Sequence, residues 1–357
     1  MERDLCSSLS LSKMTKSGLL KNIRILKFGG SSLASKSEFF RVAEIIRKDR
    51  LSHSDSEHVI VVSARMGRTN ELIKLAAEYT NVPFENSQEI LRGRELDMLL
   101  TVGERESMSL LAMILCQQGV DAVSLTGSQS GIVTDASHGN AKIQSIKATR
   151  VEALLKEGKV VVMAGFQGVS NEKEITTLGR GGSDLTAIAL ASHFSNSTAV
   201  LFSDVRGVHL GDPKIWPTAP LIREISWADS LKLAQFGMKA IYAEAAELAK
   251  KYSQPFEMKS TFESEESGTF VGDYSATSAP YLGVFVEYLQ GDYFRIHFLA
   301  KEKINSDENP LHTLLQEQEI EGSLSDEKDC YTTQKYKLDQ FAFLQAKIAN
   351  HFKEISQ

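Results

Sequence analysis

The sequence predicts an α/β protein in which a parallel sheet is covered by helices. Short apolar runs that resemble buried strands alternate with longer runs that place apolar residues on one helical face. Loops of small residues follow several of the strand-like runs, as is usual where parallel strands meet a ligand at their carboxyl ends. With 357 residues, the chain is long enough for one large α/β domain and a smaller second one.

The composition is that of an ordinary soluble globular protein, with 42% apolar and 24% charged residues. The net charge of −6 argues against a nucleic-acid-binding surface. No apolar run reaches the length of a membrane span, and residues 1–21 lack the apolar core of a signal peptide. We therefore expect a cytoplasmic protein with no nucleic-acid or membrane partner, and we expect residues 1–21 to be a frayed or disordered extension.

The cysteines are Cys6, Cys116 and Cys330. Their odd number and wide spacing indicate a reducing compartment and do not match a zinc site. Cys116 ends the apolar run that begins at Leu110, so we expect it to lie in the core.

The first half of the chain repeats one pattern, which is strand, small-residue loop and helix. Residues 23–28 form an apolar strand, and Ser35 and Glu38 have capping-box spacing before the first helix. In the same way we expect strands at 58–63, 121–125, 160–164 and 199–202, and helices at 69–79, 90–118 with a break near Val102-Gly103, 150–157 and 183–193.

In the second half we expect helices at 227–236 and 239–252 and a strand at 255–259. The composition then changes, and we place a domain boundary near Asp273 to Pro280, which gives domains at 22–275 and 276–357. In the second domain two alternating segments around Gln290-Gly291-Asp292 predict a hairpin. A final helix places these apolar residues on one side: Leu338, Phe341, Leu344, Ile348 and Phe352.

Two glycine loops are the features around which this pattern is organised. One is Lys27-Phe28-Gly29-Gly30-Ser31-Ser32, and the other is Leu178-Gly179-Arg180-Gly181-Gly182-Ser183-Asp184 at the start of a helix. Glycines let a backbone approach a ligand closely, and free N–H groups at a helix start favour an anion. Arg180 adds a planar fork suited to a carboxylate or phosphate, and Asp184 can orient a lysine.

The usual nucleotide and hydrolase signatures are missing from the sequence. It contains no G-x-x-x-x-G-K-[ST], G-x-G-x-x-G, G-x-S-x-G or H-E-x-x-H pattern. The parts that bind phosphate must therefore be the two glycine loops and their cations.

Further motifs follow the second loop in a fixed order. They are Ser203-Asp204-Val205-x-Gly207, Asp212-Pro213 and Phe236-Gly237-Met238-Lys239, after Thr176-Thr177 at the entry to that loop. Together with the two loops they closely resemble the aspartokinases of the amino-acid kinase family, from about Ile23 to Val271.

This resemblance implies a three-layer α/β/α sandwich that binds ATP, L-aspartate and Mg²⁺, the metal being held mainly through the phosphates. It implies phosphorylation of the aspartate side-chain carboxylate to 4-phospho-L-aspartate. This is the first step of the aspartate-derived amino-acid pathway, which leads to threonine, to methionine and, by way of diaminopimelate, to lysine. A carboxylate is already ionised at neutral pH and needs no general base, so positioning and cations should carry the catalysis.

The resemblance also assigns roles to residues. Lys27 would stabilise the transferring phosphoryl group and Asp184 would orient Lys27. Arg180 would clamp an aspartate carboxylate and Glu104 would receive the substrate ammonium, and Ser63, Thr69 and Ser183 would line the same substrate. The ATP-binding residues would be Lys27, Gly29, Gly30, Ser31, Gly181, Gly182, Ser203, Asp204, His209, Asp212, Lys214 and Lys239.

Some positions depart from the family pattern. Arg65 and Arg68 are less usual in the substrate loop, Ser203 replaces a common threonine, and His209 stands where a tyrosine is common. Tyr242-Ala243 replaces a common His-Pro pair. None of these changes removes a charge that phosphoryl transfer needs.

Simpler interpretations of these residues remain open. Lys27 could be a surface lysine at a strand end, and Asp184 and Glu104 could be ordinary helix acids. Another amino-acid kinase, acting on glutamate, N-acetylglutamate, carbamate or a nucleotide, is the alternative enzyme. A sensor that kept the fold without catalysis is the third possibility, although Lys27, Arg180 and Asp184 are all present.

The segment after Pro280 has about 80 residues, enough for one small ligand-sensing (ACT-like) unit in truncated or degenerate form. One unit cannot form the intrachain pair that binds feedback amino acids in the family. We therefore expect a homodimer with weak or absent inhibition by lysine or threonine.

Overall fold

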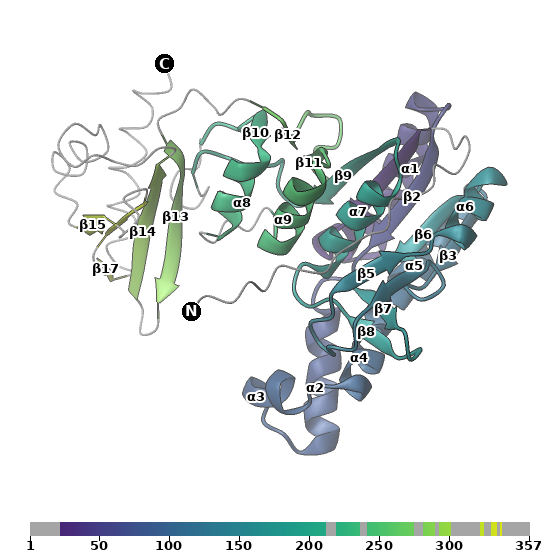
Figure 1. Ribbon diagram of the computed structural model, residues 1–357, viewed down its shortest axis with the longest axis horizontal. Coiled ribbons are helices and arrows are strands. Elements are labelled where there is room, and N and C mark those ends of the chain that lie inside the picture. Colours follow the sequence, from purple (N-terminus) through teal and green to yellow (C-terminus); the bar gives the residue numbers. More distant parts are fainter. Residues whose placement is uncertain are drawn as a thin grey trace. The chain divides into compact units, whose positions relative to one another are not determined.

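The computed structural model describes residues 22–211, 219–235, 241–274, 281–289, 293–300, 322–324, 330–333 and 336–337 (Figure 1). These residues belong to two compact units. The first contains the described residues up to Val205 together with Gln254–Glu266, and the second contains the described residues of 206–253 and those from Ser267 on. The domain boundary expected near Asp273 to Pro280 lies largely outside the described residues and stays a prediction.

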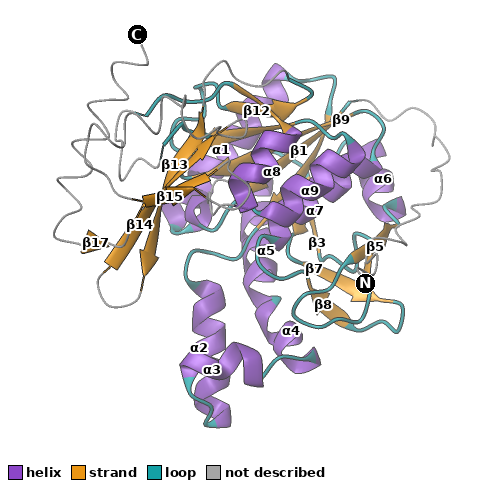
Figure 2. Ribbon diagram, turned by 60° about the vertical axis from the view of Figure 1, so that its left-hand side comes forward, coloured by secondary structure: helices purple, strands orange, loops and turns teal. Residues whose placement is uncertain are grey.

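The first unit is built on a parallel sheet with helices along its faces (Figures 1 and 2). Its strands follow the order β11-β9-β1-β2-β6-β3, and every neighbouring pair is parallel. The fold class is therefore the α/β class that the sequence predicts. The strands are β1 (Ile23–Phe28), β2 (Glu57–Val62), β3 (Ala122–Leu125), β6 (Val160–Ala164), β9 (Ser197–Ser203) and β11 (Phe256–Ser260).

Four central strands end at the same level of this sheet. Phe28 of β1 lies opposite Val62 of β2 and Phe202 of β9, and Val62 lies opposite Ala164 of β6. The loops that follow these residues therefore leave the sheet side by side. Because the chain passes from β1 to β2 in one direction and later returns to β9 on the other side of β1, these loops border a topological switch point.

The two faces of the sheet are covered by different helices. On one face, Leu26 and Phe28 share a core with α1 (Lys36–Ser52) and α5 (Val102–Gln117). On the other face, α7 (Gly182–His193) packs against β1, β2 and β9, and α6 (Thr149–Lys156) packs against β6. Because side chains alternate along a strand, Lys27 is directed away from the Leu26 and Phe28 side and towards α7.

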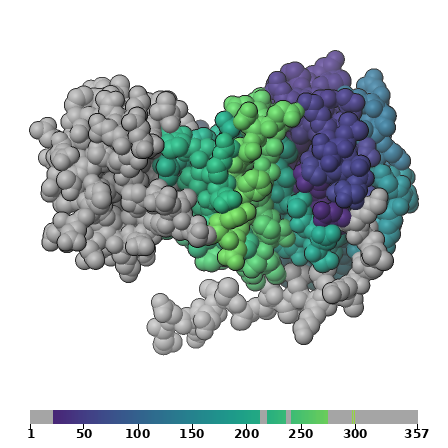
Figure 3. All heavy atoms as spheres, turned by 90° about the horizontal axis from the view of Figure 1, so that it is seen from above, coloured from purple at the N-terminus to yellow at the C-terminus, as the bar shows by residue number. Residues whose placement is uncertain are grey.

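Local packing explains why these strands and helices form. The rings of Phe28 and Phe202 stack with their centroids 4.8 Å apart, which joins β1 to β9 at the edge where the loops begin. Ser35 precedes α1, as the capping-box spacing predicts, and its hydroxyl contacts the Glu38 carboxylate. The outer side of α1 is polar and exposed, within the purple atoms of Figure 3.

Four further helical segments lie beside the carboxyl edge of the sheet. They are η1 (Ser31–Leu33), α2 (Arg68–Thr80), α3 (Phe84–Ile90) and α4 (Arg94–Leu100). The sequence predicts one helix over 90–118 with a break near Val102; the structure has a non-helical segment at 91–93 and a break at Thr101 between α4 and α5. Gly93 has φ +151°, a value that excludes helix and that most side chains do not adopt.

A small second sheet was not predicted. Its order is β5-β4-β7-β8, with strands β4 (Ile132–Thr134), β5 (Ile143–Ile146), β7 (Gln167–Ser170) and β8 (Ile175–Thr177). Each strand has three or four residues, too few for an alternating pattern to stand out in the sequence. This sheet matters for the site because β8 leads directly into the Gly179 loop.

The second unit contains β10 (Glu224–Ser226) paired in parallel with β12 (Thr269–Gly272), and the helices α8 (Trp227–Gln235) and α9 (Ala243–Tyr252). The predicted hairpin is confirmed: β13 (Tyr281–Leu289) pairs antiparallel with β14 (Tyr293–Ala300). That sheet is completed by β15 (Gly322–Leu324), β16 (Cys330–Thr333) and β17 (Tyr336–Lys337). The final helix expected from Leu338 lies outside the described residues.

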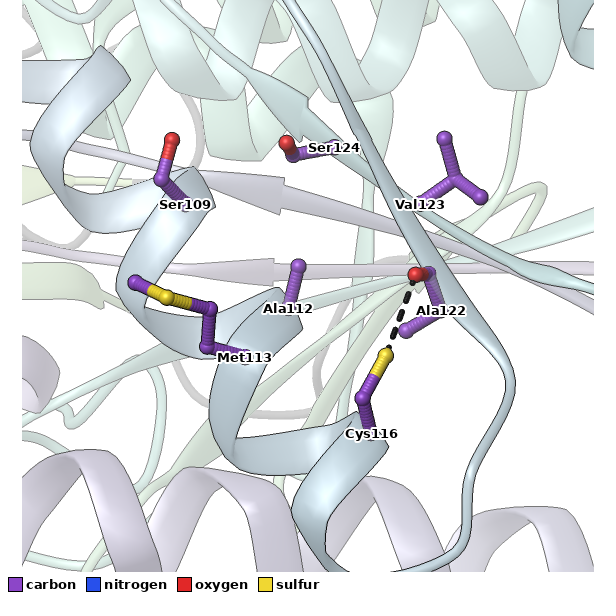
Figure 4. A pocket seen from close by; sticks show the side chains of 7 residues that line it. All are labelled: Ser109, Ala112, Met113, Cys116, Ala122, Val123 and Ser124. Atoms are coloured by element: carbon purple, nitrogen blue, oxygen red, sulfur yellow. Dashed lines mark hydrogen bonds between the residues drawn. The ribbon is translucent and has the colours of Figure 1, made fainter.

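Cys116 is a correction to the expected core. It is exposed on α5, and its thiol donates a hydrogen bond to the carbonyl oxygen of Ala122 at 3.3 Å (Figure 4). The apolar run misled because α5 has apolar residues on its solvent side as well, including Leu110 and Met113. A shallow groove there is lined by Ser109, Ala112, Met113, Cys116, Ala122, Val123 and Ser124. Over the residues that the structure describes, no helix has the length and apolar character needed to cross a membrane.

Candidate active site

The centre of the candidate site is an ion pair between Lys27 and Asp184. The Lys27 ammonium lies 2.6 Å from Oδ1 of Asp184, and both side chains are largely buried. Lys27 is the second-last residue of β1, and Asp184 lies in the first turn of α7. A negative side chain is favourable there because it faces the positive end of the helix dipole. The two residues that the sequence pairs are therefore in contact.

The Gly29-Gly30 turn follows Lys27 at the same edge. The Gly29 N–H donates to the carbonyl oxygen of Phe202, and Gly30 has φ −61°, which any residue can adopt. The requirement for glycine is therefore one of space: a Cβ on Gly30 would lie 2.9 Å from the Ala64 carbonyl oxygen. Beside this turn, the Ser31 hydroxyl lies 3.4 Å from Oδ1 of Asp204, an exposed residue at the end of β9.

Glu104 is a buried carboxylate in the first turn of α5, with 3% of its surface exposed. Its Oε1 accepts a hydrogen bond from the Ala64 N–H at 3.0 Å, whereas its Oε2 is buried and has no hydrogen-bond partner among the described residues. Burial raises the pKa of the Glu104 carboxyl to about 7, against the opposing effect of the Ala64 hydrogen bond. A cation that reaches the unpaired oxygen would stabilise the ionised form of this buried carboxyl group.

The loop after β2 connects the glycine turn to α5. The Met66 N–H donates to the carbonyl oxygen of Gly30 at 3.0 Å, and Gly103 allows close approach, since a Cβ there would lie 2.7 Å from the Ala64 Cβ. Arg68 donates two hydrogen bonds to the Glu106 carboxylate, at 3.0 and 2.7 Å. The less usual Arg68 therefore ties this loop to α5. Ser63 and Thr69 are both half-buried at the two ends of the loop.

The second glycine loop is shaped by left-handed backbone at Gly179 (φ +78°) and Gly181 (φ +74°). Behind it, Gly182, Ser183 and Asp184 are buried at the start of α7. Arg180 is exposed, and its guanidinium makes no hydrogen bond or ion pair with any described residue. Its side chain is therefore available to a ligand, which suits the predicted clamp.

The expected nucleotide-side residues are only partly accounted for. Ser203 and Asp204 lie in the first unit with the glycine loops. His209 lies in the second unit, where it forms a β-bridge with Leu221. Asp212, Lys214 and Lys239 lie outside the described residues, so their placement stays a prediction.

Asp97 is a residue of this region that sequence reasoning missed. It lies in α4 with 1% of its surface exposed and accepts hydrogen bonds from His138, Gly139 and Thr177. In the sequence it is one acid in a charged stretch, and its partners come from distant segments. No local spacing could have indicated it.

The chain is similar to known proteins over most of its length. The chain matches the amino acid kinase family over residues 22–258. It is 44% identical over 249 residues to the aspartokinase of Geobacillus stearothermophilus, which is 70% of this chain and 58% of that protein. The chain thus spans little more than half the length of that curated relative.

Solved structures show the same fold. Aspartate kinase from Synechocystis matches with a TM-score of 0.60 and 29% identity, over 91% of this chain and 54% of that one. E. coli aspartokinase III in complex with aspartate and ADP matches with a TM-score of 0.63 and 23% identity, over 88% of this chain and 78% of that one. With the family match covering about two thirds of its length, the chain belongs to the amino acid kinase family.

Proposed function

We propose that the chain is an aspartate kinase, which transfers the terminal phosphoryl group of ATP to the side-chain carboxylate of L-aspartate. The observation that carries this proposal is the buried Oε2 of Glu104, which has no hydrogen-bond partner among the described residues. The loop after β2 contacts both Glu104, through the Ala64 N–H, and Gly30, through the Met66 N–H. A buried carboxylate with a free oxygen is suited to an ammonium group. This favours a free amino acid over an acylated one such as N-acetylglutamate.

In this mechanism the aspartate side-chain carboxylate attacks the γ-phosphorus of ATP. A new O–P bond forms, the bond between the γ-phosphorus and the bridging oxygen breaks, and ADP leaves with that electron pair. The attacking carboxylate is ionised at neutral pH, so no proton has to be removed. The chain's task is to hold two anions in line and to neutralise charge that develops between them.

Lys27 would supply the principal positive charge from the protein. Asp184 holds its ammonium at 2.6 Å, which restricts the side-chain rotations that an isolated lysine would have. Arg180 would bind the aspartate α-carboxylate as a fork, and Glu104 would accept the α-ammonium. These two contacts would leave the side-chain carboxylate as the only free carboxylate of the substrate.

The nucleotide phosphates would lie against the two glycine loops, where a Cβ on Gly30 would collide with Ala64. Mg²⁺ would be held mainly by phosphate oxygens, and Asp184 and Asp204 would add hard carboxylate oxygens of the kind that it prefers. When bound, the ion neutralises charge on the transferring phosphates. E. coli aspartokinase III binds aspartate and ADP, the ligand pair that corresponds to this proposal.

The proposal extends to the biology of the reaction. We assign the chain to the first step of aspartate-derived amino-acid synthesis in the cytoplasm. This pathway leads to threonine, to methionine and, through diaminopimelate, to lysine. We also propose a homodimer, which light scattering on the purified protein would check. The sensing role suggested for residues 276–357 depends mostly on residues that the structure does not describe.

A coupled assay of ADP release tests the substrate assignment. Purified protein is given ATP, Mg²⁺ and each of L-aspartate, L-glutamate, N-acetylglutamate, carbamate and UMP. We expect release with L-aspartate, and hydroxylamine trapping of the product should give the aspartyl hydroxamate. Release with another acceptor and none with aspartate would overturn the proposal.

A further inference from the structure

Asp97 collects hydrogen bonds from two separate segments. Its Oδ2 accepts from Nδ1 of His138 at 2.7 Å and from the Thr177 N–H at 3.1 Å, and its Oδ1 accepts from the Thr177 hydroxyl at 2.5 Å. The Gly139 N–H lies 3.1 Å from both oxygens. Every donor approaches a carboxylate that is 1% exposed, so the buried charge is fully satisfied.

These bonds fix the entry to the arginine loop, which we define as residues 178–182. Thr177 is the last residue of β8 and stands three residues before Arg180. The Ala141 N–H donates to the Thr177 carbonyl oxygen at 2.8 Å. A Cβ on Gly179 would lie 2.9 Å from Oδ1 of Asn140. The segment 138–141 thus packs against the arginine loop, and Asp97 accepts hydrogen bonds from this segment and from Thr177 at the entry to the loop.

Asp97 and Glu104 belong to one continuous stretch of chain. The Thr101 N–H donates to the Asp97 carbonyl oxygen at 3.1 Å, and Thr101 separates α4 from α5, where Glu104 lies in the first turn. Arg180 and Glu104 come from segments far apart in the sequence. Through Asp97, the loop that carries Arg180 is anchored to the same α4–α5 stretch that carries Glu104.

We propose that Asp97 is a positioning residue of the amino-acid subsite, which sets the place of Arg180 relative to Glu104. This rests on the proposed function, because it assigns those two residues to the carboxylate and ammonium of one substrate. Asp97 itself, with its oxygens bonded to protein donors, would not touch the substrate. Its loss should impair amino-acid binding while leaving the Lys27 and Gly30 region, which it does not contact, unaltered.

Asp97→Asn is the direct test. The asparagine side chain keeps the shape of aspartate, but its NH₂ group replaces one accepting oxygen and would face the donors that now bond to that oxygen. We expect KM for aspartate to rise at least about tenfold, since small displacements of a binding group have large effects. KM for ATP should stay within about twofold. Thr177→Val, which removes only the hydroxyl bond, should shift KM for aspartate in the same direction by about threefold, and it serves if Asp97→Asn does not fold.

Asp49→Asn is the matched control. Asp49 is also a carboxylate that accepts several hydrogen bonds, from Arg24 at 2.7 Å and from His58 at 2.9 Å. Arg24 and His58 lie at the beginning of β1 and β2, the opposite end from the site. We expect Asp49→Asn to lower Tm and to leave both KM values within about twofold.

Amide hydrogen exchange gives a readout that does not depend on activity. Asp97→Asn should speed exchange in residues 138–141 and 177–182, and Asp49→Asn should not. If Asp97→Asn changes both KM values equally, or lowers Tm with no change in either KM or in exchange of these segments, Asp97 is only structural and the proposal is wrong. If the wild-type protein shows no aspartate-dependent ADP release, the proposed function fails, and the exchange result alone decides whether Asp97 anchors the arginine loop.

Discussion

The ammonium of Lys27 lies 2.6 Å from Oδ1 of Asp184, and this contact joins the central strand of the sheet to the first turn of α7. Both groups are largely shielded from water. The pair therefore holds the ammonium of Lys27 at the edge where four loops begin.

Lys27→Ala should lower kcat for aspartate phosphorylation by about 10²–10³, the usual effect of losing one fixed electrostatic contact in a transition state. The far-ultraviolet circular dichroism should change little, because Lys27 is not part of the apolar core. Lys48→Ala is the control, since Lys48 forms an exposed ion pair with Glu265 and should not affect kcat. A Lys27→Ala enzyme with kcat close to that of wild type would rule out the assigned role.

Asp184 and Lys27 should act as one unit. Asp184→Ala is expected to reduce kcat, because it frees the lysine side chain from its fixed position. The double variant should then lose much less than the product of the two single losses, since each removes the same interaction. Steady-state kinetics of the four proteins form the cycle. Fully multiplicative effects would show that the contact is not used in catalysis.

Aspartate binding should weaken at low pH because Glu104 must be ionised to accept an ammonium. The pKa of Glu104 is raised to about 7 by burial, so its protonated form dominates below that pH. KM for aspartate should rise up to about tenfold per pH unit as the pH falls below about 7, a range in which aspartate itself does not titrate. In Glu104→Gln, KM should be high and independent of pH over this range. A flat profile for the wild-type protein would contradict the prediction.

The same carboxyl should make the ligand-free protein less stable at alkaline pH. Its pKa in the folded state, about 7, exceeds the ordinary value of 4.5, so the folded protein holds the proton more tightly than the unfolded chain does. This contribution to stability is complete below about pH 4.5 and is lost as the pH rises through about 7, with a limit of about 3 kcal/mol. Glu104→Gln should therefore raise Tm at about pH 8 and change it little at about pH 5. Glu172→Gln, at an exposed position, should change Tm at neither pH.

Arg180→Ala should raise KM for aspartate and leave KM for ATP nearly unchanged. The side chain is exposed and has no partner among the described residues, so its removal should not alter Tm. Arg47→Ala is a suitable control, because Arg47 is exposed on α1 and its ion-pair partner among the described residues is Glu44. Equal increases in both KM values would show that Arg180 does not contribute specifically to aspartate binding.

Much of the first unit could be predicted because its signals are local. The strand at 160–164 has the predicted bounds, and the glycine loops indicate both the loop positions and the Lys27 to Asp184 contact. The small sheet could not be predicted, because its strands are very short and pair across distant segments. Asp97 was missed for the same reason, since its partners lie at 138–139 and 177. The exposed fraction of Cys116 also depends on which side of α5 meets the sheet, and α5 is apolar on more than one side.

The alternation of side chains along β1 has a consequence for folding. Leu26 and Phe28 are buried against α1 and α5, while Lys27 between them is directed to α7. A slip of β1 by one residue between β2 and β9 would turn the lysine into the apolar layer that contains Phe39 and Ile46. Burying an unpaired ammonium there would cost far more free energy than the misplaced pairing could gain. The charge of Lys27 therefore also helps to specify the register of β1 during folding. It makes misaligned pairings of the central strand unfavourable before any substrate is bound.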